Sequence, residues 1–239
     1  AAEALNVRQR FEQRRGFGNE VLHRPDEKPA GWQLQSLFMP LAKRRALEKL
    51  WPMQAAQQTA SLSVEEYLAS EPAWLERHEY LCGAIYARAG ASEVHNLISL
   101  NLAFALRTQL RGRPCKVYVA DVKVRLLISE EDVFYYPDVM VACDPRDTDS
   151  YFRRFPQVLI EVLSPQTEQT DRREKLLNYL QIETLQEYVR VAQDKSEVTV
   201  FRRANKWQPE IQREPEDLIR LPSLGFSLPI TAVYEGVKL

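Results

Sequence analysis

The sequence predicts a mixed α/β (α+β) fold in which a mixed sheet is flanked by helices. Short strand-like runs of apolar residues occupy the middle and the C-terminal part, and segments with helical apolar periodicity lie between them. The composition, 45% hydrophobic and 27% charged over 239 residues, is that of an ordinary globular protein. A domain of this length buries most of its apolar surface without disulfides or structural metals.

Charge is unevenly distributed along the chain, although the net charge is only -1. Residues 1–60 carry ten Lys and Arg against six Asp and Glu, so the remainder of the chain is acidic. An acidic domain can act on nucleic acid if a local basic patch and a bound cation meet the phosphates. The composition therefore does not exclude a nucleic-acid enzyme.

Residues 1–52 contain basic runs and few periodic apolar stretches, apart from a short predicted helix over 41–50. We expect a poorly ordered N-terminal extension, and the alternative is a DNA-binding arm. Because Met53 directly precedes the patterned part, residues 1–52 are also a candidate for sequence upstream of the true start. The predicted domain spans residues 53–239.

The three cysteines, Cys82, Cys115 and Cys143, are far apart and include no CxxC pair. Their spacing and odd number argue against a disulfide framework and a zinc site, and fit a reducing compartment. No apolar run approaches the roughly 18 residues that a membrane helix needs, and no secretory apolar region follows the N-terminus. We therefore expect a cytoplasmic protein that does not bind membranes.

The first part of the predicted domain contains two helices and a hairpin. A Ser–Glu capping box opens a short helix over 63–70, and residues 79–88 form a hairpin. A long helix follows over 92–111. Its apolar stripe comprises Ile98, Leu102, Ala105, Leu106 and Leu110.

Three strand-like runs follow the long helix. Residues 117–126 alternate in hydrophobicity, and residues 133–143 are predicted to be their antiparallel partner. Residues 158–163 are almost wholly apolar, which predicts a central buried strand. A helix over 170–181, a second hairpin over 187–202 and a loop-rich tail complete the pattern.

Two carboxylates lie inside apolar runs, where acidic residues are rare unless they are paired or bound to metal. They are Asp138 and Glu161. If their strands are neighbours, two like charges about 4 Å apart at an effective dielectric constant near 20 repel by roughly 4 kcal/mol. A divalent cation would offset this repulsion, and oxygen ligands are what Mg²⁺ prefers. The alternative is that each acid simply pairs with a nearby Arg.

Four motifs together resemble a known family. They are Asp-x-Lys-Val-Arg at 121–125, Tyr-Tyr-Pro-Asp-Val-Met-Val at 135–141, Glu-Val-Leu-Ser-Pro-x-Thr-Glu at 161–168 and Asp-Arg-x-Glu-Lys-Leu at 171–176. The set resembles the Uma-type "putative restriction endonuclease" family, which belongs to the restriction-endonuclease-like superfamily with the PD-(D/E)xK site. The resemblance runs from about Leu62 to Tyr234.

This resemblance implies roles for individual residues. Asp138 matches the acid of the Pro-Asp motif, and Glu161 matches the second metal ligand, for Mg²⁺ or Mn²⁺. The superfamily lysine normally follows that acid by two residues, where this chain has Leu163, so the resemblance points instead to Lys175 on the next helix. Asp121 matches a family acid in a supporting role, and the alternative for it is a salt bridge at the sheet edge.

One departure from the family pattern concerns the first hairpin. The family usually has Asp-Gly-Glu where this chain has Cys82-Gly83-Ala84. The missing Glu is an expected member of the acidic cluster. Its loss implies weaker metal binding or a degenerate, inactive copy.

Other polar residues have two readings each. His95 lies on the apolar stripe of the long helix and is either a core histidine or a supporting residue of the site. Four basic residues near the end of that helix are either phosphate contacts or a solvated face. These are Arg107, Arg111, Arg113 and Lys116.

The expected function is metal-dependent hydrolysis of DNA phosphodiester bonds, with Asp138, Glu161 and Lys175 as the catalytic residues. The alternative is a catalytically degenerate nuclease fold that serves as a binding module for nucleic acid or protein. DNA is the expected partner, and a homodimer is compatible with this reading.

Overall fold

The computed structural model describes residues 62–88, 90–163 and 171–239, except for the side chains of residues 171–173. The chain divides into two compact units, Ala1–Ser63 and Val64–Leu239, and the described helices and strands all belong to the second. The extension predicted over residues 1–52, with its helix at 41–50, lies outside the described residues.

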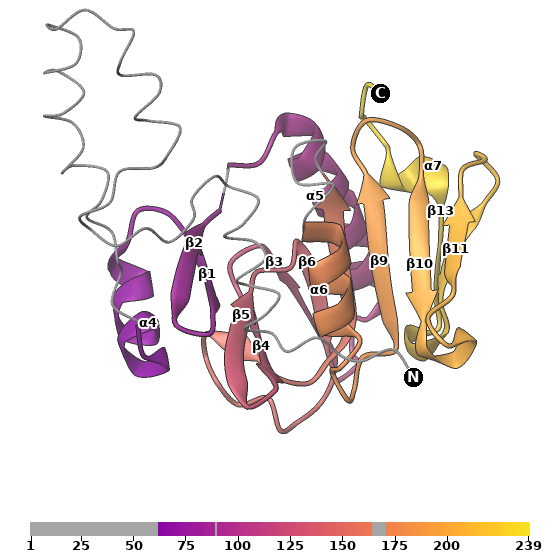
Figure 1. The fold of residues 1–239 in the computed structure, drawn as a ribbon. Coiled ribbons are helices and arrows are strands. Elements are labelled where there is room, and N and C mark those ends of the chain that lie inside the picture. Colours follow the sequence, from indigo (N-terminus) through magenta and orange to yellow (C-terminus); the bar gives the residue numbers. More distant parts are fainter. Residues whose placement is uncertain (1–61, 89, 164–170) are drawn as a thin grey trace, which may run out of the picture. The chain divides into compact units, whose positions relative to one another are not determined.

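A six-stranded mixed sheet forms the centre of the second unit, in the order β11-β10-β9-β8-β6-β3 (Figure 1). Strand β8 pairs antiparallel with β6 and parallel with β9, so the apolar run at 158–163 is a central strand, as predicted. The strands are β3 (Lys116–Val119), β6 (Val139–Ala142), β8 (Pro156–Leu163), β9 (Glu187–Ala192), β10 (Val198–Arg202) and β11 (Pro209–Gln212).

A five-stranded sheet lies beside it, in the order β2-β1-β5-β4-β7. The predicted hairpin at 79–88 is β1 and β2, and its turn residues Cys82 and Gly83 have φ of 51° and 91°. Two successive positive φ values suit the right-handed twist of a tight hairpin. The strands are β1 (His78–Leu81), β2 (Ala84–Ala87), β4 (Lys123–Ile128), β5 (Glu131–Tyr135) and β7 (Phe152–Arg153).

The prediction of two long antiparallel strands over 117–126 and 133–143 was wrong in one respect: both runs break in the middle. Strand β4 pairs with β5 in the five-stranded sheet, whereas β3 pairs with β6 in the six-stranded sheet. The breaks lie at Ala120, whose φ is 56°, and at Pro137, which has no N–H to donate to a ladder. The long hairpin therefore divides between the two sheets.

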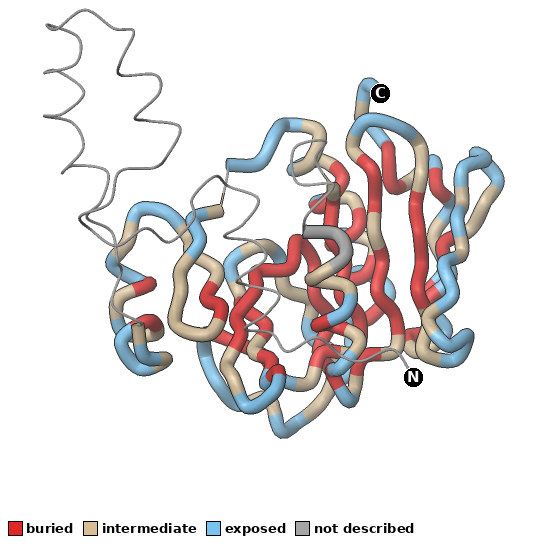
Figure 2. The backbone as a smooth tube through the Cα atoms, in the orientation of Figure 1, coloured by how far each residue is buried: buried red, intermediate tan, exposed pale blue. Residues whose placement is uncertain are grey.

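Two helices flank the six-stranded sheet, with α6 (Asp171–Tyr179) in front of it and α5 (Glu93–Gln109) behind it in Figure 1. The Ser92 hydroxyl accepts a hydrogen bond from the backbone N–H of His95 at 3.1 Å, which caps α5 as expected for a Ser at this position. The stripe of α5 packs on the sheet: Ile98, Leu102, Leu106 and Leu110 are buried and Ala105 is partly buried. The inner strands of this sheet are mostly buried, as Figure 2 shows for β9 and β10, whereas the edge strands β3 and β11 are exposed or intermediate.

The remaining elements are short. The helix predicted over 63–70 is α4 (Val64–Ser70), and the helix predicted over 170–181 is shorter than expected. The tail predicted to be loop-rich contains strands that sequence periodicity did not indicate. The two strands of the tail are β12 (Leu218–Leu221) and β13 (Phe226–Pro229). The other short elements are η1 (Glu71–Ala73), η2 (Arg203–Asn205), η3 (Pro222–Leu224) and α7 (Ile230–Val233).

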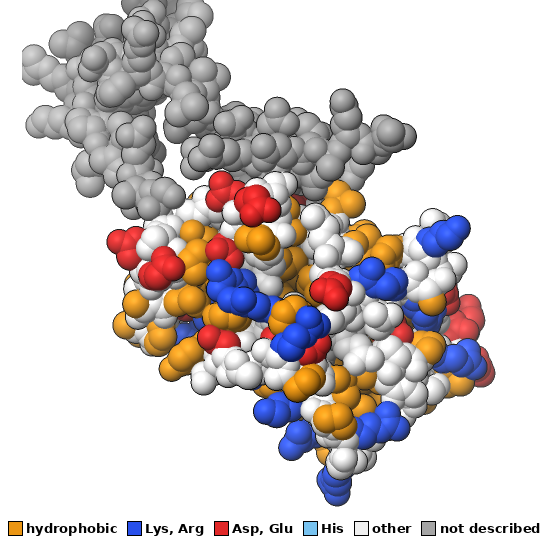
Figure 3. Space-filling model, turned by 90° about the horizontal axis from the view of Figure 1, so that it is seen from below, with side chains coloured by type: hydrophobic (Ala, Val, Ile, Leu, Met, Phe, Trp, Pro, Cys, Tyr) orange, Lys and Arg blue, Asp and Glu red, His pale blue; other side chains and the backbone are white. Residues whose placement is uncertain are grey.

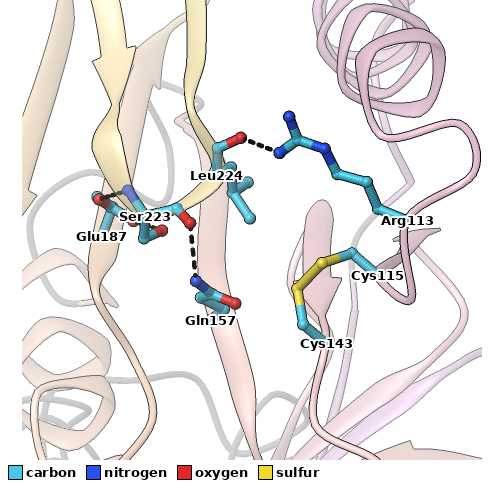
Figure 4. Close-up of a disulfide and its surroundings, with 7 residues drawn as sticks. All are labelled: Arg113, Cys115, Cys143, Gln157, Glu187, Ser223 and Leu224. Atoms are coloured by element: carbon cyan, nitrogen blue, oxygen red, sulfur yellow. Dashed lines mark hydrogen bonds between the residues drawn. A yellow bond between two sulfur atoms is a disulfide. The ribbon is translucent and has the colours of Figure 1, made fainter.

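A disulfide joins Cys115 to Cys143, which corrects the expectation drawn from cysteine spacing (Figure 4). The two residues are 28 positions apart, but the β3–β6 register pairs Lys116 with Ala142 and so brings the flanking cysteines together, with Cα atoms 4.0 Å apart. The spacing of the two cysteines along the chain could not predict that they would meet beside two paired strands. Cys82 is not part of this disulfide.

Among the described helices, none combines the length and the apolar character needed to cross a membrane.

Candidate active site

Asp138 lies at the point where the long hairpin divides, directly before β6. The residue is 4% exposed, and its two oxygens have polar partners from three separate segments of the chain. Oδ2 accepts from the backbone N–H of Val162 on β8 at 2.8 Å and lies 3.1 Å from Nε2 of His95. Oδ1 accepts from Nη2 of Arg88 at 3.2 Å. Because β6 begins only at Val139, the Val162 N–H donates to the Asp138 carboxylate and not to a backbone carbonyl of β6.

Glu161 lies on β8, next to the residue that donates to Asp138, and is 7% exposed. Its Oε1 accepts a hydrogen bond from the Tyr179 hydroxyl at 2.7 Å and lies 3.8 Å from Nζ of Lys175. Both partners come from α6. The strands of Asp138 and Glu161 are antiparallel neighbours, with Val139 opposite Ile160, so the two acids lie side by side as the sequence predicted.

Lys175 connects Glu161 to a third acid. Its ammonium donates a hydrogen bond to Oε1 of Glu79 on β1 at 2.7 Å and lies 5.2 Å from the centre of the Tyr135 ring. Glu79 therefore brings the five-stranded sheet into the same cluster. The site is built where the two sheets and α6 meet.

The site shifts the pKa values of its acids in opposite directions. Burial would raise the pKa of Asp138, but the hydrogen bond and charge of His95, the Val162 N–H and Arg88 together hold it below its usual value. Burial raises the pKa of Glu161 to about 7, where the charges of Asp138 and Glu79 also raise it and Lys175 opposes them. Two neighbouring acids with separated pKa values are typical of functional sites.

His95 joins this cluster through its contact with Asp138. Burial lowers the pKa of His95, but the hydrogen bond and the negative charge of Asp138 outweigh it, so the pKa lies above its usual value. The imidazole is therefore protonated, and pairs with Asp138 as a cation, up to a higher pH than a free histidine would be. His95 precedes Ile98 by three residues on α5, so it lies on the same helix face as the apolar stripe.

Asp121 is not brought into the cluster. Its side chain is 71% exposed and lies 3.6 Å from Nε of Arg77. This arrangement matches the alternative reading, a salt bridge at the sheet edge, and such exposed pairs contribute little to stability.

The four basic residues at the end of α5 also lie apart from the cluster. Arg107 follows His95 by twelve helical residues, which is about 18 Å along the axis. Arg113 donates to the carbonyl of Leu224 at 2.6 Å, beside the disulfide in Figure 4, and Lys116 begins the edge strand β3. Arg107 and Arg111 are exposed. The structure does not bring any of the four to the acids.

Sequence reasoning missed three residues that the structure places in the site. Glu79 was noted only as the start of a hairpin, although it shares a strand face with Leu81, and an acid on an inward-facing position is a usable signal. Tyr179 lies one helical turn after Lys175 on the same face of α6, which spacing could have indicated. Nothing in the sequence marks Arg88.

Position 84 lies on the same face of the hairpin as Glu79. The register pairs Leu81 with Ala84 and Glu79 with Tyr86, so residues 79, 81, 84 and 86 point to one side. A side chain at position 84 is a diagonal neighbour of Glu79, about 7 Å away. The family's Glu would therefore face the same side as the acids of the site.

Comparisons with known proteins agree with this architecture. The family model Uma2, described as "Putative restriction endonuclease", matches residues 64–231. The uncharacterized protein slr1290 of Synechocystis is 35% identical over 178 residues, covering 74% of this chain and 93% of its own. The uncharacterized protein sll1609 of the same organism is 35% identical over 144 residues, covering 59% and 80%.

A solved structure from Anabaena variabilis, described as a putative nuclease belonging to DUF820, superposes with a TM-score of 0.60 at 20% identity. The match covers 73% of this chain and 98% of that chain. The fold is therefore that of a nuclease-like α+β protein with mixed sheets flanked by helices. This chain belongs to the Uma2 family, and the family assignment supports a nuclease-like function.

Proposed function

We propose that this protein is a metal-dependent endonuclease that hydrolyses DNA phosphodiester bonds, with Asp138, Glu161 and Lys175 as its catalytic residues. The observation that carries the proposal is the convergence of two buried carboxylates, one directly before β6 and one on the adjacent strand β8, with an ammonium 3.8 Å from the second. The family assignment supports the same reaction class.

The donor set fits Mg²⁺ or Mn²⁺ as a partial ligand shell. Among the described residues, no group of three or more His, Cys, Asp and Glu is arranged to hold a metal ion. Mg²⁺ is, however, usually bound through one or two carboxylates together with substrate phosphates and water, rather than in a cage of protein ligands. Both described contacts of Glu161 fall on Oε1, and Asp138 and Glu161 would hold the ion. When bound, the ion would neutralise phosphate charge and acidify a water molecule.

The chain's own residues supply the remaining chemistry. Lys175 holds a positive charge between Glu161 and Glu79, where it can stabilise the additional negative charge of a pentacovalent transition state. The Tyr179 hydroxyl and the Val162 N–H fix the orientation of the two acids, so that each carboxylate presents one geometry. His95 holds Asp138 in the same way from α5.

The face of the second unit drawn in Figure 3 mixes Lys and Arg with Asp, Glu and apolar side chains. Such a mixed surface does not attract a polyanion over a long range. Among the described residues, Lys175 is the cation beside Glu161 that would contact the scissile phosphate, whereas Arg88 and His95 contact Asp138.

A plasmid-nicking assay tests the proposal. We expect the wild-type chain to convert supercoiled plasmid to nicked and linear forms with Mg²⁺ or Mn²⁺, and to be inactive with EDTA. Asp138→Asn should abolish this conversion. Asp132→Asn is the matched control, because Asp132 pairs with Arg125 at 2.6 Å outside the site, and its cleavage rate should equal that of the wild type. Equal cleavage by the Asp138 variant would refute the assignment.

The second candidate function is a degenerate nuclease fold that binds nucleic acid or protein without cutting. It is favoured by Ala84 in place of the family's Glu and by Asp138, whose two oxygens already have partners within the chain. Fluorescence anisotropy with labelled DNA in EDTA distinguishes the two. Tight binding in EDTA, combined with no nicking in Mg²⁺ or Mn²⁺, would establish the binding protein.

A further inference from the structure

Arg88 is a cation in direct contact with Asp138, one of the two acids that would hold the metal ion. Its Nη2 donates to Oδ1 of Asp138 at 3.2 Å, and its Nη1 donates to the carbonyl of Ala120 at 3.3 Å. Its guanidinium carbon lies 5.4 Å from the centre of the Tyr136 ring, and its backbone N–H is bonded to the carbonyl of Arg77. These contacts together hold the Arg88 side chain against Asp138.

Two acids of the cluster already have a cationic partner within the chain. Glu79 is paired with Lys175, and Asp138 is paired with Arg88 and hydrogen-bonded to His95. A divalent cation approaching Asp138 would meet a guanidinium at hydrogen-bond distance from the same carboxylate. Two positive charges at such a separation repel by several kcal/mol at an effective dielectric constant near 20.

We infer that Arg88 is an internal counter-ion that competes with the divalent cation for Asp138, and that it leaves this carboxylate when the ion binds. The inference deepens the proposed function and rests on it. The side chain of Arg88 is 25% exposed, whereas that of Asp138 is 5% exposed, so the guanidinium can leave toward solvent while the acid stays in place. Arg88 is a positioning residue, because it acts on the ion through Asp138.

Calorimetric titration of the full chain with Mn²⁺, without DNA, tests this inference. Arg88→Gln should bind Mn²⁺ at least tenfold more tightly than the wild type, because the competing charge is gone. Arg88→Lys keeps the charge and should stay within threefold of the wild type. Arg125→Gln is the matched control, because Arg125 is also 25% exposed and pairs with an acid outside the site, and its Mn²⁺ affinity should not change.

The outcomes separate this inference from the proposed function. Equal Mn²⁺ affinity in Arg88→Gln and wild type would overturn the counter-ion role and leave the metal site standing. If neither protein binds Mn²⁺, both proposals fail. A purely structural Arg88 would lower the melting temperature of the Gln variant without changing its Mn²⁺ affinity.

A second measurement uses the wild-type chain and does not depend on the variant's folding. Phenylglyoxal modifies accessible guanidinium groups, and peptide mass spectrometry reads the modification at Arg88. The rate at Arg88 should rise severalfold on addition of Mn²⁺, while the rate at Arg125 should stay constant. An unchanged rate at Arg88 under saturating Mn²⁺ would contradict its release from Asp138.

Discussion

Strands β8 and β9 are parallel neighbours, and each carries a buried glutamate in a different setting. Glu161 lies near the C-terminal end of β8, where its neighbours are Asp138, Lys175 and Tyr179. Glu187 begins β9, opposite Val158, and accepts hydrogen bonds from the backbone N–H and the hydroxyl of Ser223 (Figure 4). Burial raises the pKa of both acids.

The difference between the two glutamates lies in their partners. Glu187 accepts hydrogen bonds from the neutral donors of Ser223 in η3, which ties β9 to the C-terminal tail, and the charge that acts on it is that of the cation Arg202. Glu161 shares its surroundings with two further acids and a lysine from three other elements. A buried acid by itself is thus a weak sign of function, whereas converging acids of unequal pKa are a strong one.

The largest expected difference concerns activity. Glu161→Gln should reduce metal-dependent plasmid nicking by at least about 10²–10³-fold, because it removes a ligand and a charge from the reacting centre. Glu187→Gln has the same change of side chain in the same sheet and should leave the nicking rate unchanged. Initial rates of both variants against the wild type check this, and equal losses would erase the distinction between the two acids.

The next effect concerns stability. Lys175→Gln leaves Glu79 and Glu161 without their shared cation, and because the Lys175–Glu79 pair is only partly buried, the loss should be below the roughly 3–5 kcal/mol of a fully buried pair. Ser223→Ala removes one neutral donor from Glu187 and should cost about 1–3 kcal/mol. Urea denaturation without metal compares the two. A larger loss of unfolding free energy in Ser223→Ala than in Lys175→Gln would contradict the stabilising role of the Lys175 charge between Glu79 and Glu161.

The pH dependence of stability separates the two regions further. The folded-state pKa of Glu161 is raised from 4.5 to about 7, so the folded protein binds this proton more tightly than the unfolded chain does. The resulting contribution to the free energy of unfolding is fully present below about pH 4.5 and is lost as the pH rises through 7. The melting temperature without metal should therefore fall between pH 5 and 8, by the equivalent of up to about 3 kcal/mol.

Substitutions identify which residues cause this fall of the melting temperature with pH. Glu161→Gln should flatten most of it, and Glu161→Gln with Glu187→Gln should flatten it more, because the pKa of Glu187 is also raised. The raised pKa of His95 contributes with the same sign. Asp138, whose pKa is lowered, acts only at more acidic pH. A Glu161→Gln protein with the full wild-type slope would show that this acid is not the source.

The smallest expected effect tests the departure at position 84. Ala84→Glu should strengthen Mg²⁺ binding and lower stability without metal by about 1 kcal/mol, because it adds a carboxylate on the face of Glu79. Ala87→Glu adds the same charge on the opposite face of β2 and is the control. Calorimetry and melts with and without Mg²⁺ measure both effects. Indistinguishable affinities in the two variants would mean that position 84 does not act on the site.

Patterning alone located most of the elements that hold the site. The hairpin at 79–88, the α5 stripe, the central strand and the pair β9–β10 follow from periodicity and turn chemistry, because each repeats a local rule along the chain. The break at Pro137 was missed, since both halves of the run are equally apolar. The short strands of the tail were missed because they contain few buried positions.

The sequence by itself determined that two acids, Asp138 and Glu161, lie in apolar strands and that Lys175 follows on a helix, because burial of an acid is visible as a violation of pattern. Only the tertiary structure decided that Glu79 and Arg88 join them, that the basic end of α5 lies elsewhere, and that Cys115 meets Cys143. These are contacts between segments far apart in sequence. They depend on the division of one hairpin between two sheets, which no local rule encodes.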